Sequence, residues 1–144
     1  MDTQSYANHR KFVPMFHGVL LFMLALTVIG SLVNLYESFG DHQRLYSASL
    51  IAVLSVGVLM LFFFCRIFSL KAQDRAIRAE ENLRHFVLTG KLPDPRLTIR
   101  QIIALRFAPD DELIPLARRA AEESLTSDAI KRAIKKWRPD TYRV

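Results

Sequence analysis

Residues 12–36 read FVPMFHGVLLFMLALTVIGSLVNLY, and residues 45–65 read LYSASLIAVLSVGVLMLFFFC. Neither stretch contains Asp, Glu, Lys or Arg, and they are 25 and 21 residues long. At a rise of about 1.5 Å per residue, even the shorter stretch spans roughly 32 Å as a helix, against a hydrocarbon core of about 30 Å. The sequence therefore predicts two transmembrane helices, at about residues 14–36 and 45–70.

A short polar turn, residues 37–44, separates the two predicted spans, so they must form an antiparallel hairpin. Basic residues gather on one side of this hairpin, before the first span and after the second: Arg10, Lys11, Arg66, Lys71, Arg75 and Arg78. The intervening turn carries only Arg44. Because cytosolic flanks of membrane helices are enriched in Lys and Arg, we expect both termini in the cytosol.

The expected fold is therefore an all-α membrane protein with three regions. Residues 1–13 form a cytosolic N-terminal arm, residues 14–70 the transmembrane hairpin, and residues 71–144 a cytosolic helical stalk and tail. The last region holds 16 of the 20 Lys and Arg residues and 11 of the 14 Asp and Glu residues, a net charge of +5. Charge is thus concentrated outside the predicted membrane segments.

Small and polar residues mark one side of each predicted span, in the halves nearest the turn. They are Thr27, Gly30, Ser31 and Asn34 in the first span and Ser47, Ala48, Ala52 and Ser55 in the second. Lipid offers no hydrophobic drive for helix pairing, so close approach and polar links must supply the contact. We expect these two sets to face each other.

The second span is predicted to continue as a stalk to about Thr89. Its apolar residues are spaced four, three, four and three apart, which is the seam of a coiled coil: Ala72, Ala76, Ala79, Leu83 and Phe86. Asp74 with Arg78, and Glu80 with Arg84, are candidate i,i+4 ion pairs. Gly90 then provides a helix stop, and Pro93 and Pro95 follow it.

Three short amphipathic helices are expected after the stalk. The first has a capping box between Thr98 and Gln101 and a core face of Ile99, Ile102, Ile103 and Phe107. The second begins near Asp110 or Asp111, with Pro115 in its first turn and an apolar side of Leu113, Leu116, Ala117, Ala120 and Ala121. The third is capped by Thr126 and is expected to run to Pro139.

The third of these helices is the most suggestive element for binding. Its apolar stripe is Ile130, Ala133, Ile134 and Trp137, and the surrounding basic residues are Lys131, Arg132, Lys135, Lys136 and Arg138. Such a helix can lie on an anionic lipid surface or meet nucleic acid phosphates, the second being the weaker expectation. The alternative is a helix that packs its stripe on its neighbours and leaves its charges in water.

No pattern for catalysis or for a cofactor is evident. His9, His17, His42 and His85 share no metal-ligand spacing, and no nucleophile is paired with a base. The single cysteine, Cys65, excludes an internal disulfide. We expect no enzyme activity, no metal and no cofactor.

Residues 71–86 (KAQDRAIRAEENLRHF), the segment through Gly90 to TIRQIIALRF at residues 98–107, the Asn8-His9 opening and the KKWRPDxYRV ending together resemble a known group of sequences. They are similar to an uncharacterised family of small two-span bacterial membrane proteins. The resemblance covers nearly the whole chain. It implies location in a bacterial plasma membrane and implies no particular activity.

The leading hypothesis is a non-enzymatic membrane-anchored interaction or accessory protein. Its tail would meet a cytosolic or membrane partner, or another copy of the chain, through the stalk seam and a charged surface around Arg75, Arg78, Arg84, Arg100 and Arg106. Binding of anionic lipid or nucleic acid by the basic last helix is one alternative. A subunit of an oligomeric channel or transporter is another.

Overall fold

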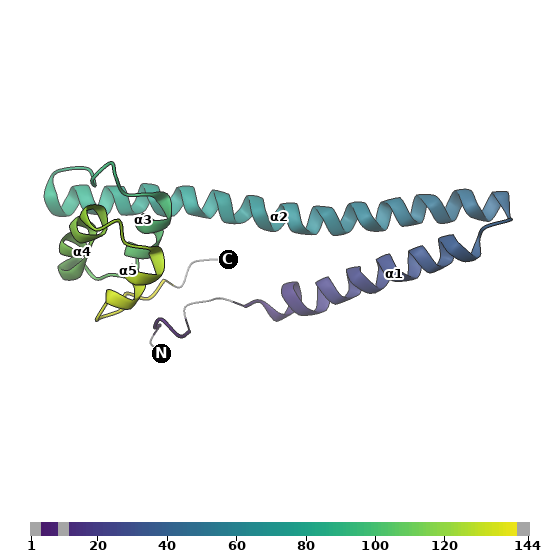
Figure 1. Ribbon diagram of the computed structural model, residues 1–144, viewed down its shortest axis with the longest axis horizontal. Coiled ribbons are helices and arrows are strands. Elements are labelled where there is room, and N and C mark those ends of the chain that lie inside the picture. Colours follow the sequence, from purple (N-terminus) through teal and green to yellow (C-terminus); the bar gives the residue numbers. More distant parts are fainter. Residues whose placement is uncertain (1–3, 9–11, 141–144) are drawn as a thin grey trace. The chain divides into compact units, whose positions relative to one another are not determined.

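The computed structural model describes residues 4–8 and 12–140. The chain forms a π-helical turn, η1 (Met15–Leu20), and five α-helices: α1 (Leu21–Glu37), α2 (His42–Thr89), α3 (Ile99–Leu105), α4 (Asp110–Glu122) and α5 (Ser127–Ala133) (Figure 1). No strand occurs among the described residues, so the all-helical prediction is confirmed. His9 and the predicted cytosolic flank of Arg10 and Lys11 lie outside the described residues, as does the end of the chain after Asp140.

The chain divides into two compact units, and each is described by itself. One is Phe12–Phe68, which holds η1, α1 and the first part of α2. Met15–Glu37 and His42–Thr89 are 23 and 48 residues long and are long and apolar enough to cross a membrane, by length and composition. The other unit combines Ser69–Val144 with Met1–Lys11.

Within the unit of residues 12–68, the first part of α2 runs back along α1 after the turn at residues 38–41 (Figure 1). The Oγ atoms of Ser31 and Ser55 lie 2.8 Å apart and form a buried hydrogen bond between the two helices. Ala48 and Ala52 are buried on the same side of α2. Small side chains and a polar link make this part of the contact, as expected from the sequence, and the ring of Phe16 stacks on that of the buried Phe62 with centroids 4.3 Å apart.

Not every predicted hairpin residue takes part in that contact. Thr27, Gly30, Asn34 and Ser47 are exposed. The hydroxyl of Thr27 donates instead to the carbonyl of Met23 in its own helix, at 2.8 Å. A helix turns by about 100° per residue, so only part of a broad polar stripe can point at one neighbour.

In the other unit, α2 ends as predicted at Thr89. Gly90 has a φ of +70°, a left-handed conformation that suits glycine, and its N–H donates to the carbonyl of Phe86 at 2.7 Å. The capping box at Thr98 is also confirmed, with Gln101 bonded reciprocally to Thr98. Thr126 caps α5 by accepting from the N–H of Ala129 at 3.1 Å.

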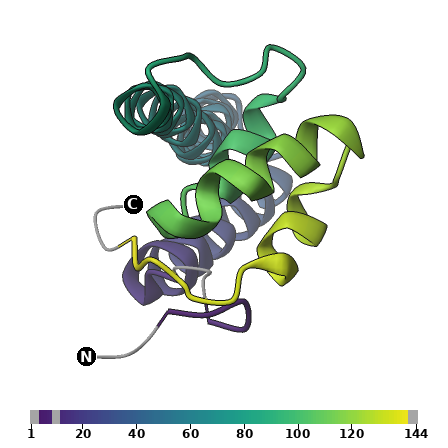
Figure 2. The ribbon, with the colours of Figure 1, turned by 90° about the vertical axis from the view of Figure 1, so that its left-hand side faces the viewer.

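The core of this unit lies between α3, α4, α5 and the segment after α5 (Figure 2). Phe107 and Ile130 are the largest fully buried side chains among the described residues. Gln101 is buried with them, and its Nε2 donates to the carbonyls of Ala120 and Leu125 at 3.2 and 2.9 Å. This amide therefore ties the start of α3 to the end of α4, and its burial costs little because its polar atoms are bonded.

Three details of the expected helices are wrong. Ile99 is exposed, and Ala104 and Leu105 are buried in its place. Pro115 lies in the second turn of α4, because that helix begins at Asp110. α5 ends at Ala133, and Ile134 is already extended with a ψ of 122°, so the helix is shorter than predicted.

The loop from α2 to α3 holds the carboxylate with the most strongly shifted pKa. The side chain of Arg96 donates to both carboxylate oxygens of Asp94, at 2.7 to 3.2 Å, and its N–H adds a bond at 2.9 Å. These bonds, the side-chain ones first, lower the pKa of Asp94 from 3.8 to about 2.

Substitution of Arg96 by Gln (R96Q) should raise the pKa of Asp94 toward 3.8, because the side-chain donors are lost. The lowered pKa makes this pair stabilise the fold at pH values above 3.8, and the effect disappears as the pH falls through about 2. A carbon-detected NMR titration of the Asp94 carboxyl in the full chain measures the shift. Arg44→Gln, which breaks the exposed pair with Asp41 in the other unit, is the control and should leave Asp94 unchanged.

Candidate functional site: a charged junction

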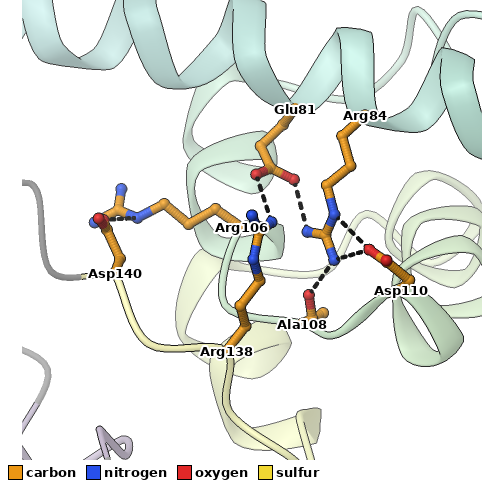
Figure 3. Close-up of polar contacts among 7 residues, drawn as sticks. All are labelled: Glu81, Arg84, Arg106, Ala108, Asp110, Arg138 and Asp140. Carbon is orange, nitrogen blue, oxygen red and sulfur yellow. Dashed lines mark hydrogen bonds and ion pairs between the residues drawn. The ribbon is translucent and has the colours of Figure 1, made fainter.

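A cluster of paired charges joins the stalk, residues 71–89 of α2, to the segments that follow α3 and α5 (Figure 3). We call it the charged junction: Glu81, Arg84, Arg106, Asp110, Arg138 and Asp140. At its centre the carboxylate of Glu81 accepts from Nη1 of Arg84 at 3.0 Å and lies 3.7 Å from Nη1 of Arg138. The Glu81 side chain is only 10% exposed, so these cations replace the water that it gives up.

Arg84 connects the stalk to the start of α4. Its Nε donates to Oδ1 of Asp110 at 2.7 Å, and its Nη2 donates to the carbonyl of Ala108 at 2.8 Å (Figure 3). The expected partner within the helix was Glu80. That expectation is corrected here, because Arg84 points toward α4 and uses Glu81, one position further along.

Arg106 forms the other half of the junction. Its Nε lies 2.9 Å from Oδ2 of Asp140, and its guanidinium lies 4.4 Å from the centre of the Phe107 ring. Both contacts favour a charged group that is largely withdrawn from water. A cavity of about 390 Å³ opens beside Glu81, Arg106, Arg138 and Asp140.

The ion pairs of the charged junction attach the stalk to the segments that follow α3 and α5. Glu81, Arg106, Arg138 and Asp140 beside the cavity are held in ion pairs, whereas Glu80, which also lines it, is exposed and in no ion pair among the described residues. Among the described residues, no three His, Cys, Asp or Glu side chains are grouped as metal ligands.

A second polar contact explains why α5 ends early. The two carboxylate oxygens of Glu112 accept from the N–H groups of Lys135 and Lys136, at 2.9 and 3.0 Å. In a continuing helix these N–H groups would bond to carbonyls four residues before them. Beyond them, the ring of Trp137 packs 4.8 Å from that of Phe107, and the N–H of Arg138 donates to the Phe107 carbonyl at 2.8 Å.

The predicted basic helix is therefore divided between two local structures. Lys131 and Arg132 lie on α5, with Lys131 Nζ 6.0 Å from the Phe107 ring centre and Arg132 paired with Asp128 at 3.1 Å. Lys135 and Lys136 are exposed on the extended segment, and Arg138 belongs to the charged junction. The five basic residues do not share one helix.

Sequence reasoning missed the contact between the N-terminal arm and α5. The hydroxyl of Tyr6 donates to Oδ1 of Asp128 at 2.5 Å and accepts from Arg132 at 3.2 Å. Gln4 accepts from the N–H of Asp140 at 2.7 Å. The Tyr6 bond, with Asp128 beside it, raises the pKa of Arg132 above its ordinary value. These partners are more than 120 positions apart, so no local pattern could have revealed them.

The five arginines of the predicted interaction surface differ in their exposure. Arg75, Arg78 and Arg100 are exposed, whereas the side chains of Arg84 and Arg106 are 12% and 11% exposed within the charged junction. The structure brings Arg84 and Arg106 into one cluster and leaves the other three outside it. The five seam residues, by contrast, are all exposed: Ala72, Ala76, Ala79, Leu83 and Phe86.

Fold and site together define a class: an all-helical protein with two helices long and apolar enough to cross a membrane, and a set of short helices fastened by ion pairs. Comparison with protein families gives the particular membership. A model described as a family of unknown function, DUF6526, matches residues 1–144, and the chain belongs to this family. No curated protein and no solved structure matches the chain.

Replacement of Glu81 by Gln should lower the free energy of unfolding of the tail by about 1–3 kcal/mol, because Arg84 and Arg138 lose a charged acceptor in a site largely closed to water. Trp137 is the single tryptophan of the chain and packs on Phe107, so its fluorescence during denaturation of the detergent-solubilised protein reports the change. Glu80→Gln is the matched control. The Glu80 carboxylate is exposed, so this substitution should change the free energy of unfolding by no more than about 0.5 kcal/mol. Equal effects of the two substitutions would contradict the assignment of Glu81 to the centre of the charged junction.

Proposed function

We propose that this protein is a membrane-anchored interaction protein without enzyme activity, placed in the bacterial plasma membrane with both termini in the cytosol. The hairpin of residues 14–70 anchors the chain. The stalk and the short helices then present a surface to a partner. The observation that carries the proposal is the exposed apolar face of the stalk, which no other part of the described chain covers.

Membrane anchoring is supported by which side chains of residues 12–68 are exposed. In the most apolar stretch of each long helix, only 6% of the first and 17% of the second is buried inside the structure. Phe22, Val53 and Leu54 are among the large apolar side chains that point outward. A core helix of a water-soluble protein buries such residues, whereas a bilayer solvates them.

The shared side of the two termini is supported by the contact of the N-terminal arm with the tail. Tyr6 and Gln4 bond to Asp128, Arg132 and Asp140. Two ends that touch must lie on the same side of a membrane, which requires an even number of crossings. Two spans satisfy this condition, and the distribution of basic residues then favours the cytosolic side.

An interaction role is supported by the contrast between the two faces of the stalk. Ile77 and Glu81 are buried, while Leu83 is 63% and Phe86 49% exposed. Large apolar side chains that are grouped on one exposed face are typical of a surface that another molecule covers. Binding to anionic surfaces is less well supported, because the basic residues after Ala133 are not on a helix.

Reporter fusions to the full chain test the anchoring. A fluorescent reporter that matures only in the cytosol should be active at either terminus, and a phosphatase that is active only outside the cytosol should work when inserted in the turn at residues 38–41. The chain should also resist extraction of membranes by alkaline carbonate, because the spans are solvated by lipid. Phosphatase activity at the carboxyl terminus would contradict the proposed topology.

Chemical cross-linking of native membranes tests the interaction role. The tagged full chain should give adducts larger than the monomer, and Leu83→Asn with Phe86→Asn should reduce their yield severalfold, because the apolar contact is lost. Ile99→Asn is the control, since Ile99 is an exposed apolar residue on α3, away from the stalk. A chain that inserts correctly and gives no adducts would contradict the interaction role while leaving the anchoring intact.

A further inference from the structure

The stalk has two faces, and the tail covers only one of them. Ile77, Glu81 and Arg84 turn toward the tail and its ion pairs. At about 100° per residue, Ala79 and Leu83 lie roughly opposite them on the helix. We call the opposite face the stalk seam: Ala72, Ala76, Ala79, Leu83 and Phe86, all of them exposed.

The spacing within the stalk seam specifies the kind of surface that fits it. Intervals of four, three, four and three residues place Ala76 and Leu83 at the a positions of a heptad repeat, and Ala72, Ala79 and Phe86 at the d positions. Such a seam is covered by a second helix with the same repeat, whose side chains enter the spaces between its own. The alanines allow the two backbones to approach closely, and Leu83 and Phe86 supply apolar area.

The charges beside the stalk seam complement a second copy of the same helix. In this repeat Arg75 occupies a g position and Glu80 the following e position. In a parallel pair, a g residue of one helix faces the e residue five positions on in the other, which sets Arg75 against Glu80. Both residues are exposed, and no ion pair to either occurs within the described part of the chain.

The opposite orientation lacks this match. In an antiparallel pair, e positions face e positions and g positions face g positions, so Arg75 at g would not face Glu80 at e. Two copies anchored in one bilayer also present their stalks on the same side and in the same direction.

We infer that a second copy of this chain covers the stalk seam in a parallel two-stranded coiled coil over residues 72–86, with Arg75 of each copy paired with Glu80 of the other. The inference rests on the proposed function, which supplies the common orientation. Two heptads are short for a coiled coil in free solution, where three or four are usual. Confinement to a membrane raises the effective concentration of the partner, and the tail already holds the stalk helical, so less entropy is lost on pairing.

Disulfide cross-linking of single-cysteine variants in native membranes tests this inference. The exposed native Cys65 is first replaced by Ser, and cysteine is then placed in the stalk seam by Ala76→Cys or Ala79→Cys. Arg78→Cys, on the exposed surface beside the seam, is the matched control. Mild oxidation should give at least tenfold more covalent dimer from the two seam positions than from the control, because symmetry brings equal seam positions of a parallel pair together.

A charge exchange tests the register. Glu80→Arg should lower the dimer fraction in diluted lipid vesicles by about twofold, and so should Arg75→Glu, because an exposed ion pair contributes only modestly to an association. The double variant, which exchanges the two charges, should restore it. Failure of the double variant to recover would overturn the proposed pairing of Arg75 with Glu80.

The remaining outcomes separate this inference from the proposed function. Correct membrane insertion with no seam-specific dimer would overturn the coiled coil and leave the anchoring standing. Seam cysteines that give an adduct of another mass would show that a different protein occupies the stalk seam. Equal cross-linking at seam and control positions would indicate random collision and would also overturn the inference. A chain released from membranes by carbonate would instead overturn the proposed function.

Discussion

The carboxylate of Glu81 sits in a place almost closed to water, and a carboxylate there needs cations. Arg84 comes from the same helix, but Arg138 comes from the segment beyond α5. To supply Arg138, the chain after α5 must return to the stalk, and the end of the helix at Ala133, followed by a bend at residues 135–136, makes this return possible. Desolvation offsets much of the attraction between such charges, so the junction fixes where the tail binds more than how strongly it is held.

This arrangement partly reverses the usual distribution of apolar and charged side chains on an amphipathic helix. A helix at a protein surface normally buries its apolar stripe and exposes its charges. In the stalk, Glu81 and Arg84 are withdrawn from water together with Ile77, whereas Leu83 and Phe86 are exposed. The hairpin shows a related reversal, since the buried contact contains the hydroxyls of Ser31 and Ser55 while most large apolar side chains of residues 12–68 point outward. Both features support the proposed function, in which lipid surrounds the hairpin and another surface covers the stalk.

Features that depend on neighbours in the chain were accessible from the sequence. The length of the two uncharged stretches, the stop at Gly90, the capping box at Thr98 and the cap at Thr126 all follow from local chemistry and appear in the structure. The heptad spacing of the stalk seam is likewise a property of consecutive turns of one helix. Each of these is determined by groups within a few residues of one another.

Only the tertiary structure decided which partner each charged side chain takes. Arg84 had an equally good candidate in Glu80, and the position of Asp110, brought close by folding, selected Glu81 and Asp110 in its place. The apolar and basic pattern after Ala133 predicted a longer helix, yet Glu112 takes the N–H groups of Lys135 and Lys136. Tyr6 reaches Asp128 and Arg132 across nearly the whole chain. Local periodicity determines where helices form, whereas competition among distant donors and acceptors determines where they end and what they bind.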